Sequence, residues 1–160
     1  MDQVTAYESD YYAWTQAQAE ALRAARAAGT NLPLDWENLI EEVADLGGSL
    51  RREVESSLAR VIEHLLKLEH ARQEEPRRGW KLSVAEHRDR IEASLRDSPS
   101  LRRLLPDLLP PAWRRGRKLA ATALALYDED ATLPHSCPYA LDDLCRDDWY
   151  PESRQGLPRA

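Results

Sequence analysis

The residues of this sequence that could bind a metal or take part in acid–base catalysis are three glutamate-histidine pairs. A carboxylate and an imidazole together could bind a transition metal or exchange protons with a substrate. Helical di-metal sites space these ligands as Glu-x-x-His, because residues three apart share one face of a helix. No acidic residue stands three positions before any of the four histidines, so the spacing predicts neither a metal nor another cofactor. The pairs are Glu63-His64, Glu69-His70 and Glu86-His87.

An enzyme or metalloprotein is still one of three hypotheses for the function. It requires His64 and Lys67 to share a cleft with acids of earlier helices, for which Asp10, Glu41 and Glu42 are the candidates. The alternative for His64 is a half-buried imidazole that bonds to a neighbouring helix. The chain has no phosphate-binding glycine loop, nucleophile elbow or dinucleotide fingerprint. Catalysis is therefore not the leading hypothesis, and no catalytic residue is assigned.

The two cysteines and the remaining histidines give further signals. His135, Cys137 and Cys145 supply only three ligands, at a spacing that fits no zinc site. The cysteines bracket an expected short helix, so their Cα atoms would lie about 12 Å apart, too far for a disulfide. We expect free thiols in a reducing compartment. The alternative is a reactive Cys137, whose thiol pKa a helix N-terminus would lower, but such a cysteine also needs a base, and the sequence identifies none beside it. His87 falls on the core face of its helix, where a bonded interior histidine is expected.

The net charge of −6 is distributed unevenly. Residues 1–50 sum to −7, residues 51–118 to +6 and residues 119–160 to −5. One interpretation is that acidic helices lie against basic ones; the other is a surface for nucleic acid or another polyanion. The second hypothesis for the function rests on the basic residues of one predicted helix, but no groove-reading motif accompanies them. They are Arg114, Arg115, Arg117 and Lys118, with Arg102 and Arg103 nearby.

Helical periodicity runs along the whole chain, and no segment alternates long enough to predict a strand. We expect an all-α protein, a single compact bundle of six or seven helices over residues 1–160, with an ordered core over about 7–151. The central helix is predicted over 49–70, where Leu50, Val54, Leu58, Val61, Leu65 and Leu68 form one apolar stripe. Gly47-Gly48 costs about 2 kcal/mol of helix propensity, which favours a break or bend there over a close helix crossing.

The other predicted helices follow from caps and breakers. Ser9 or Asp10 caps the first and Gly29 ends it, while Asp35 caps the second. Pro106, Pro110 and Pro111 are expected to interrupt or kink the path before the last long helix, and Gly116 on its apolar face predicts a close neighbour. The remaining helices are predicted over 80–97, 99–105, 111–127 and from Pro138 to Cys145.

The surplus of apolar helix faces motivates the leading hypothesis, a helical interaction or scaffolding module. A leftover stripe would bind another protein or a second copy, giving a homodimer. The first residues, MDQVTAYESD, include acids and no apolar run, and no stretch approaches the roughly 18 apolar residues of a membrane span. A cytoplasmic protein without membrane contact is therefore expected.

Five segments in this order also resemble a known family, the bacterial domain-of-unknown-function family numbered twenty-nine. The resemblance covers about residues 7–151 and implies an all-helical bacterial protein, but it implies no reaction and no site residue. The chain departs from the pattern at His87 and Leu68. The segments read YESDYYAWTQAQAEALR, DWENLIEEVADLG, HLLKLE, GWKLSVAEHRDRIEASLRDSPSLR and CPYALDDLCRDDWYP.

Overall fold

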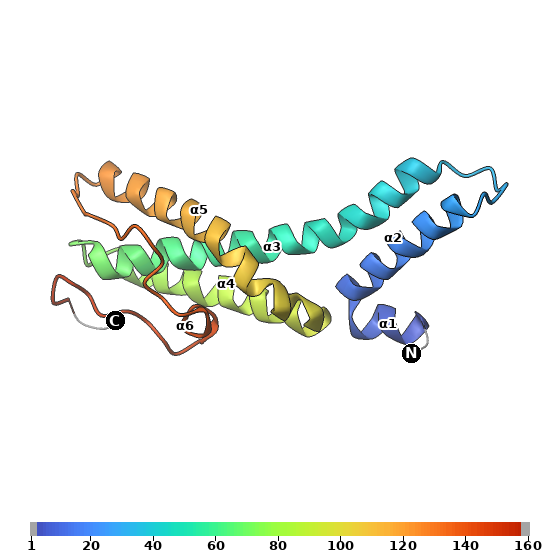
Figure 1. Cartoon of the computed structure of the whole chain (residues 1–160). Coiled ribbons are helices and arrows are strands. Elements are labelled where there is room, and N and C mark those ends of the chain that lie inside the picture. Colours follow the sequence, from blue (N-terminus) through green and yellow to red (C-terminus); the bar gives the residue numbers. More distant parts are fainter. Residues whose placement is uncertain (1–2, 158–160) are drawn as a thin grey trace. The chain divides into compact units, whose positions relative to one another are not determined.

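A computed structural model describes residues 3–157 of the 160-residue chain, with side chains from Ala6 onward. Every regular element of this described part is a helix (Figure 1), which confirms the all-α prediction. None of these helices is long and apolar enough to cross a membrane. The elements are α1 (Gln3–Ser9), α2 (Tyr11–Ala27), α3 (Trp36–His70), α4 (Arg77–Asp97), the 3-10 helix η1 (Pro99–Leu104), α5 (Leu105–Leu126) and α6 (Leu141–Cys145).

The chain divides into two compact units, and α3 and α4 contribute residues to both. Unit 1 comprises residues 1–53 and 93–104, and unit 2 comprises residues 54–92 and 105–160. The prediction of a single domain stays a prediction, and each unit is described by itself below.

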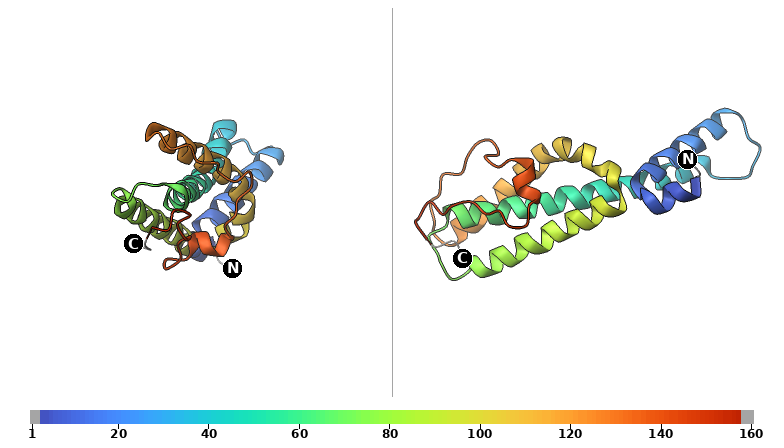
Figure 2. Two further views of the ribbon diagram at one scale, coloured as in Figure 1. Left: turned by 90° about the vertical axis from the view of Figure 1, so that its left-hand side faces the viewer. Right: turned by 90° about the horizontal axis from the view of Figure 1, so that it is seen from below.

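In unit 1, α2 and the first part of α3 form an antiparallel hairpin (Figures 1 and 2). Asp10 caps α2 as predicted, because its Oδ1 accepts a hydrogen bond of 2.9 Å from the backbone N–H of Ala13. The same carboxylate accepts bonds of 2.8 Å from the backbone N–H and the hydroxyl of Ser100. Gly29 follows α2 with φ of 74°, a left-handed conformation that glycine adopts without strain.

The predicted break at Gly47-Gly48 is wrong, since α3 continues through both glycines as one helix of 35 residues. The alternative, a close crossing, explains Gly47. A Cβ atom at this position would lie 2.5 Å from Gln16 Nε2 and 2.6 Å from Thr15 Oγ1. The missing side chain therefore lets α2 approach α3, and this packing offsets the cost in helix propensity.

The core of unit 2 forms around the second part of α3, whose apolar stripe is buried as predicted. Its members from Val54 to Leu68 are at most 1% exposed. Gly116 of α5 lies directly against α3, because a Cβ atom there would meet the carbonyl oxygen of Ala59 at 2.5 Å. This confirms the close neighbour predicted at Gly116.

The starts of α4, α5 and α6 differ from the sequence-based boundaries. α4, expected from residue 80, begins at Arg77. The helix expected from residue 111 already begins at Leu105 and runs through Pro110 and Pro111. Pro110 and Pro111 are the sixth and seventh residues of this helix, so each lacks the N–H that would bond to the carbonyl four residues earlier. The helix continues without these two bonds because the φ of proline is compatible with a helix. α6 starts at Leu141, so Pro138 lies before it.

A buried arginine fastens the segment of α6 to α4. Arg88 is 1% exposed, and its guanidinium donates hydrogen bonds of 2.9 Å to the carbonyls of Leu144 and Asp143. A third bond of 3.3 Å reaches the carbonyl of Asp147. The guanidinium of Arg88 thus supplies hydrogen-bond donors to the backbone carbonyls of a segment that forms little secondary structure of its own.

Candidate functional site

Lys67, a residue of the predicted cleft, is held in a buried ion pair of unit 2. Its Nζ lies 2.9 Å from Glu63 Oε1, and the two residues are 6% and 5% exposed. Arg60 Nη1 donates a bond of 2.7 Å to the other carboxylate oxygen, and Lys67 Nζ lies 5.2 Å from the centre of the Trp80 ring. Burial alone would raise the pKa of Glu63, but the hydrogen bonds from Lys67 and Arg60 hold it below its ordinary value.

His64 and His87 are half-buried neutral imidazoles of the same unit. Burial, followed by the charge of Lys67, lowers the pKa of His64 to about 4. Burial also lowers the pKa of His87, and Arg90 acts in the same direction. Within the described part of the chain, the buried Nδ1 atoms of both imidazoles lack a hydrogen-bond partner. The predicted hydrogen bonds that would satisfy these nitrogens are therefore not found.

A dependence of stability on pH follows from the lowered pKa of His64. The unfolded chain, with a histidine pKa near 6.5, takes up a proton before the folded chain does. We expect the free energy of unfolding to be retained above about pH 6.5 and to fall as the pH drops towards about 4. Urea titrations at several pH values measure this decrease, and a His64→Leu variant should show a shallower one. An equally steep decrease in that variant would contradict the assignment to His64.

The three acids of the predicted cleft lie in unit 1. Asp10 is occupied by its bonds to Ala13 and Ser100, whereas Glu41 and Glu42 are exposed on α3. His64 and Lys67 belong to unit 2. The five-residue cleft therefore stays a prediction.

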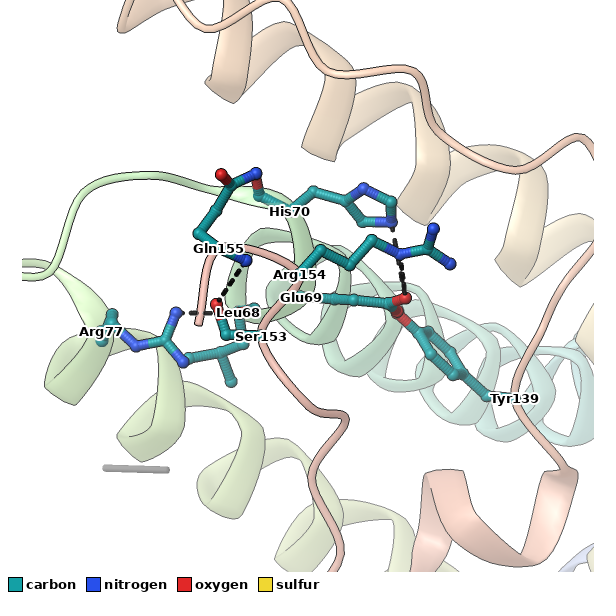
Figure 3. Close-up of polar contacts among 8 residues, drawn as sticks. All are labelled: Leu68, Glu69, His70, Arg77, Tyr139, Ser153, Arg154 and Gln155. Carbon is teal, nitrogen blue, oxygen red and sulfur yellow. Dashed lines mark hydrogen bonds and ion pairs between the residues drawn. The ribbon is translucent and has the colours of Figure 1, made fainter. Parts of the chain in front are cut away.

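A second polar cluster in unit 2 surrounds Glu69 and was not predicted (Figure 3). The hydroxyl of Tyr139 donates to Glu69 Oε2 at 2.7 Å, and Arg154 Nε donates to Oε1 at 2.8 Å. Burial and this bond to Glu69 raise the pKa of Tyr139. His70 Nε2 is buried 3.8 Å from Glu69 Oε1, without a hydrogen-bond partner among the described residues. The cluster fastens the C-terminal segment to the end of α3.

The basic residues of α5 are only partly available to a polyanion. Arg117 is half-buried and donates bonds of 2.6 Å and 3.3 Å to the carbonyls of Pro134 and Leu133. Arg114, Arg115 and Lys118 are exposed. Three side chains of the predicted set thus remain for an anion, while Arg117 holds a loop, and anion binding stays a prediction.

The thiols do not have the surroundings of reactive cysteines. Cys137 and Cys145 are free and half-buried. Burial raises the pKa of Cys137. The lowering that a helix N-terminus would give does not arise, because α6 begins four residues later. Among the residues that the structure describes, no three histidine, cysteine or acidic side chains are grouped to hold a metal ion.

The hairpin of unit 1 exposes an apolar face, which we define as Leu39, Val43, Leu46 and Leu50. Their steps of four, three and four residues place them on one side of α3. Leu39 is 37% and Leu46 is 45% exposed, and the other two are half-buried. At about 100° per residue, this face lies to one side of Ile40 and Gly47, which pack towards α2, while Glu37 and Glu41 lie to the other.

The connection between α2 and α3 adds exposed leucines to the same unit. Leu32 and Leu34 are 58% and 47% exposed. Of the large apolar side chains that are exposed in the described residues, five belong to unit 1 and three to unit 2. The apolar face of unit 1 is therefore the candidate docking surface.

Comparison with known proteins agrees with this fold. The family model described as domain of unknown function DUF29 matches residues 6–150. The crystal structure of an α-helical protein of unknown function from Rhodospirillum rubrum is similar, with a TM-score of 0.73 and 26% sequence identity over 89% of this chain and 90% of that one. No curated protein matches. The chain belongs to the DUF29 family.

Proposed function

We propose that this protein is a helical interaction module that binds an amphipathic helix of another protein on the apolar face of unit 1. The exposure of Leu39 and Leu46 on a regular helical stripe carries this proposal. A partner helix with apolar residues at the same spacing would bury these side chains, as in other helix-in-groove complexes. Removing one leucine side chain from water in this way contributes about 1.5–3 kcal/mol of favourable free energy to the complex.

The charge of unit 1 specifies the kind of partner. Its two segments contain eleven acidic and seven basic residues, a net charge of −4. Glu42 and Glu53 are exposed and border the apolar face on the side away from α2. A partner helix with basic residues beside its apolar stripe would complement this border, whereas an acidic one would be repelled.

Fluorescence anisotropy tests the proposal with two labelled helical peptides, one built from leucine and lysine and its twin from leucine and glutamate. We expect the basic peptide to bind in the micromolar range and the acidic twin at least about tenfold more weakly. Leu46→Lys should weaken binding of the basic peptide at least about tenfold, because it places a charge in the apolar face.

Leu82→Lys is the matched control, since Leu82 is 62% exposed but belongs to unit 2. It should leave binding unchanged. Equal binding of both peptides, or equal losses in the two leucine variants, would show that the apolar face of unit 1 is not the docking surface.

We also propose a bacterial, cytoplasmic setting for this module. The similar α-helical protein is from a bacterium, and the two free thiols suit a reducing compartment.

A further inference from the structure

The hairpin of unit 1 also has an open groove, on the side of α3 opposite the apolar face. It has a volume of about 880 Å³ and runs between α2 and the start of α3. Ile40, which is 8% exposed, lies at its base, and Ala27 and Ala44 also line it. The base of the groove is therefore apolar.

The two walls of this groove carry opposite charges. Arg23 and Arg26 form the wall on α2, and Glu37 and Glu41 belong to the wall on α3. Arg26 and Glu37 face each other across it, with Nη2 and Oε2 3.8 Å apart and the side chains 51% and 79% exposed. So weak and exposed a pair leaves both charges able to interact with a second partner.

We propose that the groove docks a second copy of this chain. A copy related by a two-fold axis parallel to the helices places its α2 over α3 and its α3 over α2. Each basic wall then faces an acidic wall, and the contact occurs twice by symmetry. The four helices form an antiparallel bundle in which neighbours alternate in charge.

Charge excludes the other simple arrangement. A two-fold axis perpendicular to the helices would place α3 over α3, so that Glu37 and Glu41 would face their own counterparts. Like charges so placed repel each other and disfavour that arrangement. In the favoured arrangement, the aliphatic stems of Arg23 and Arg26 can cover the base of the partner's groove while their guanidinium groups reach its acids.

The contact between the two copies is small, so the dimer should be weak. α2 has 17 residues and is about 25 Å long, and two adjacent helices are about 20 Å wide. Two such faces together bury on the order of 1,000 Å², the lower limit for a specific interface. The dimer should therefore be reversible and sensitive to salt, because exposed charges steer it.

Sedimentation velocity on the full chain tests this arrangement through charge reversal. The wild-type chain should dimerise at about 0.05 M salt and dissociate at least tenfold more readily at about 1 M. The double variants Arg23→Glu/Arg26→Glu and Glu37→Lys/Glu41→Lys should each be monomeric. An equimolar mixture of the two should recover a dimer of one chain of each kind.

A monomeric wild-type chain at low salt would overturn the inference. So would a mixture that stays monomeric although circular dichroism shows both variants to be folded. The inference is independent of the proposed function: Leu46→Lys should dimerise normally, and Arg23→Glu/Arg26→Glu should still bind the basic peptide. Loss of one property without the other therefore shows which assignment has failed.

Discussion

Glu63→Met is expected to lower the free energy of unfolding by about 3–5 kcal/mol. The change leaves the ammonium group of Lys67 buried beside the Trp80 ring without its carboxylate partner. Lys67→Met should cost less, because Arg60 still bonds to Glu63 from a position that is 45% exposed. Substituting Glu63 and substituting Lys67 thus differ in their cost to stability, because Arg60 bonds to Glu63 and not to Lys67.

The double variant Glu63→Met/Lys67→Met provides the control. It removes both buried charges and leaves apolar side chains of similar volume, so its stability should return to near that of the wild-type chain. Guanidinium titrations of the three variants and the wild-type chain measure these differences. Additive losses in the double variant would mean that the charges are not coupled as the 2.9 Å contact indicates.

Gly116→Ala is the second change with a large expected effect: it should lower the free energy of unfolding by about 2 kcal/mol. The new Cβ atom would lie 2.5 Å from the carbonyl oxygen of Ala59 and 2.9 Å from Ile62 Cβ. Because Ala59 O is a backbone atom in the middle of α3, the two helices must separate to admit the methyl group. This cost exceeds the roughly 1 kcal/mol that alanine gains over glycine in a helix.

Gly79→Ala is the matched control for this change. Gly79 is also helical, but a Cβ atom there has no neighbour within 4 Å. Alanine should raise the melting temperature at this position and lower it at Gly116, as differential scanning calorimetry would show. The same direction of change at both positions would contradict the close approach of α5 to α3.

The parts of the fold that follow from local patterns were predictable from the sequence. Asp10 caps α2 through its own carboxylate. The apolar residues of α3 recur every three or four positions, a period that fits only a helix. The break at Gly47 was wrong because the close approach of Thr15 and Gln16 decides that position. Such a tertiary contact leaves no mark on local helix propensity.

Of the candidate sites, too, only those with a local sequence pattern could be predicted. The stretch around His64 and Lys67 could be singled out from its composition, and the acid four residues before Lys67 is its actual partner. Glu69 and Tyr139 are 70 residues apart, and no local pattern links them. The apolar face beside Leu46 was visible as a surplus of leucines, but its exposure depends on which stripes the other helices cover.

The three carbonyls that Arg88 holds are each more than 50 residues away along the chain. Contacts of such long range add a large loop-closure cost and tend to form late in folding. The α6 segment should therefore dock after the helices have assembled, so that weakening its attachment accelerates unfolding more than it slows folding. Amide protons of Leu144 and its neighbours should consequently exchange with solvent before those of the α3 core.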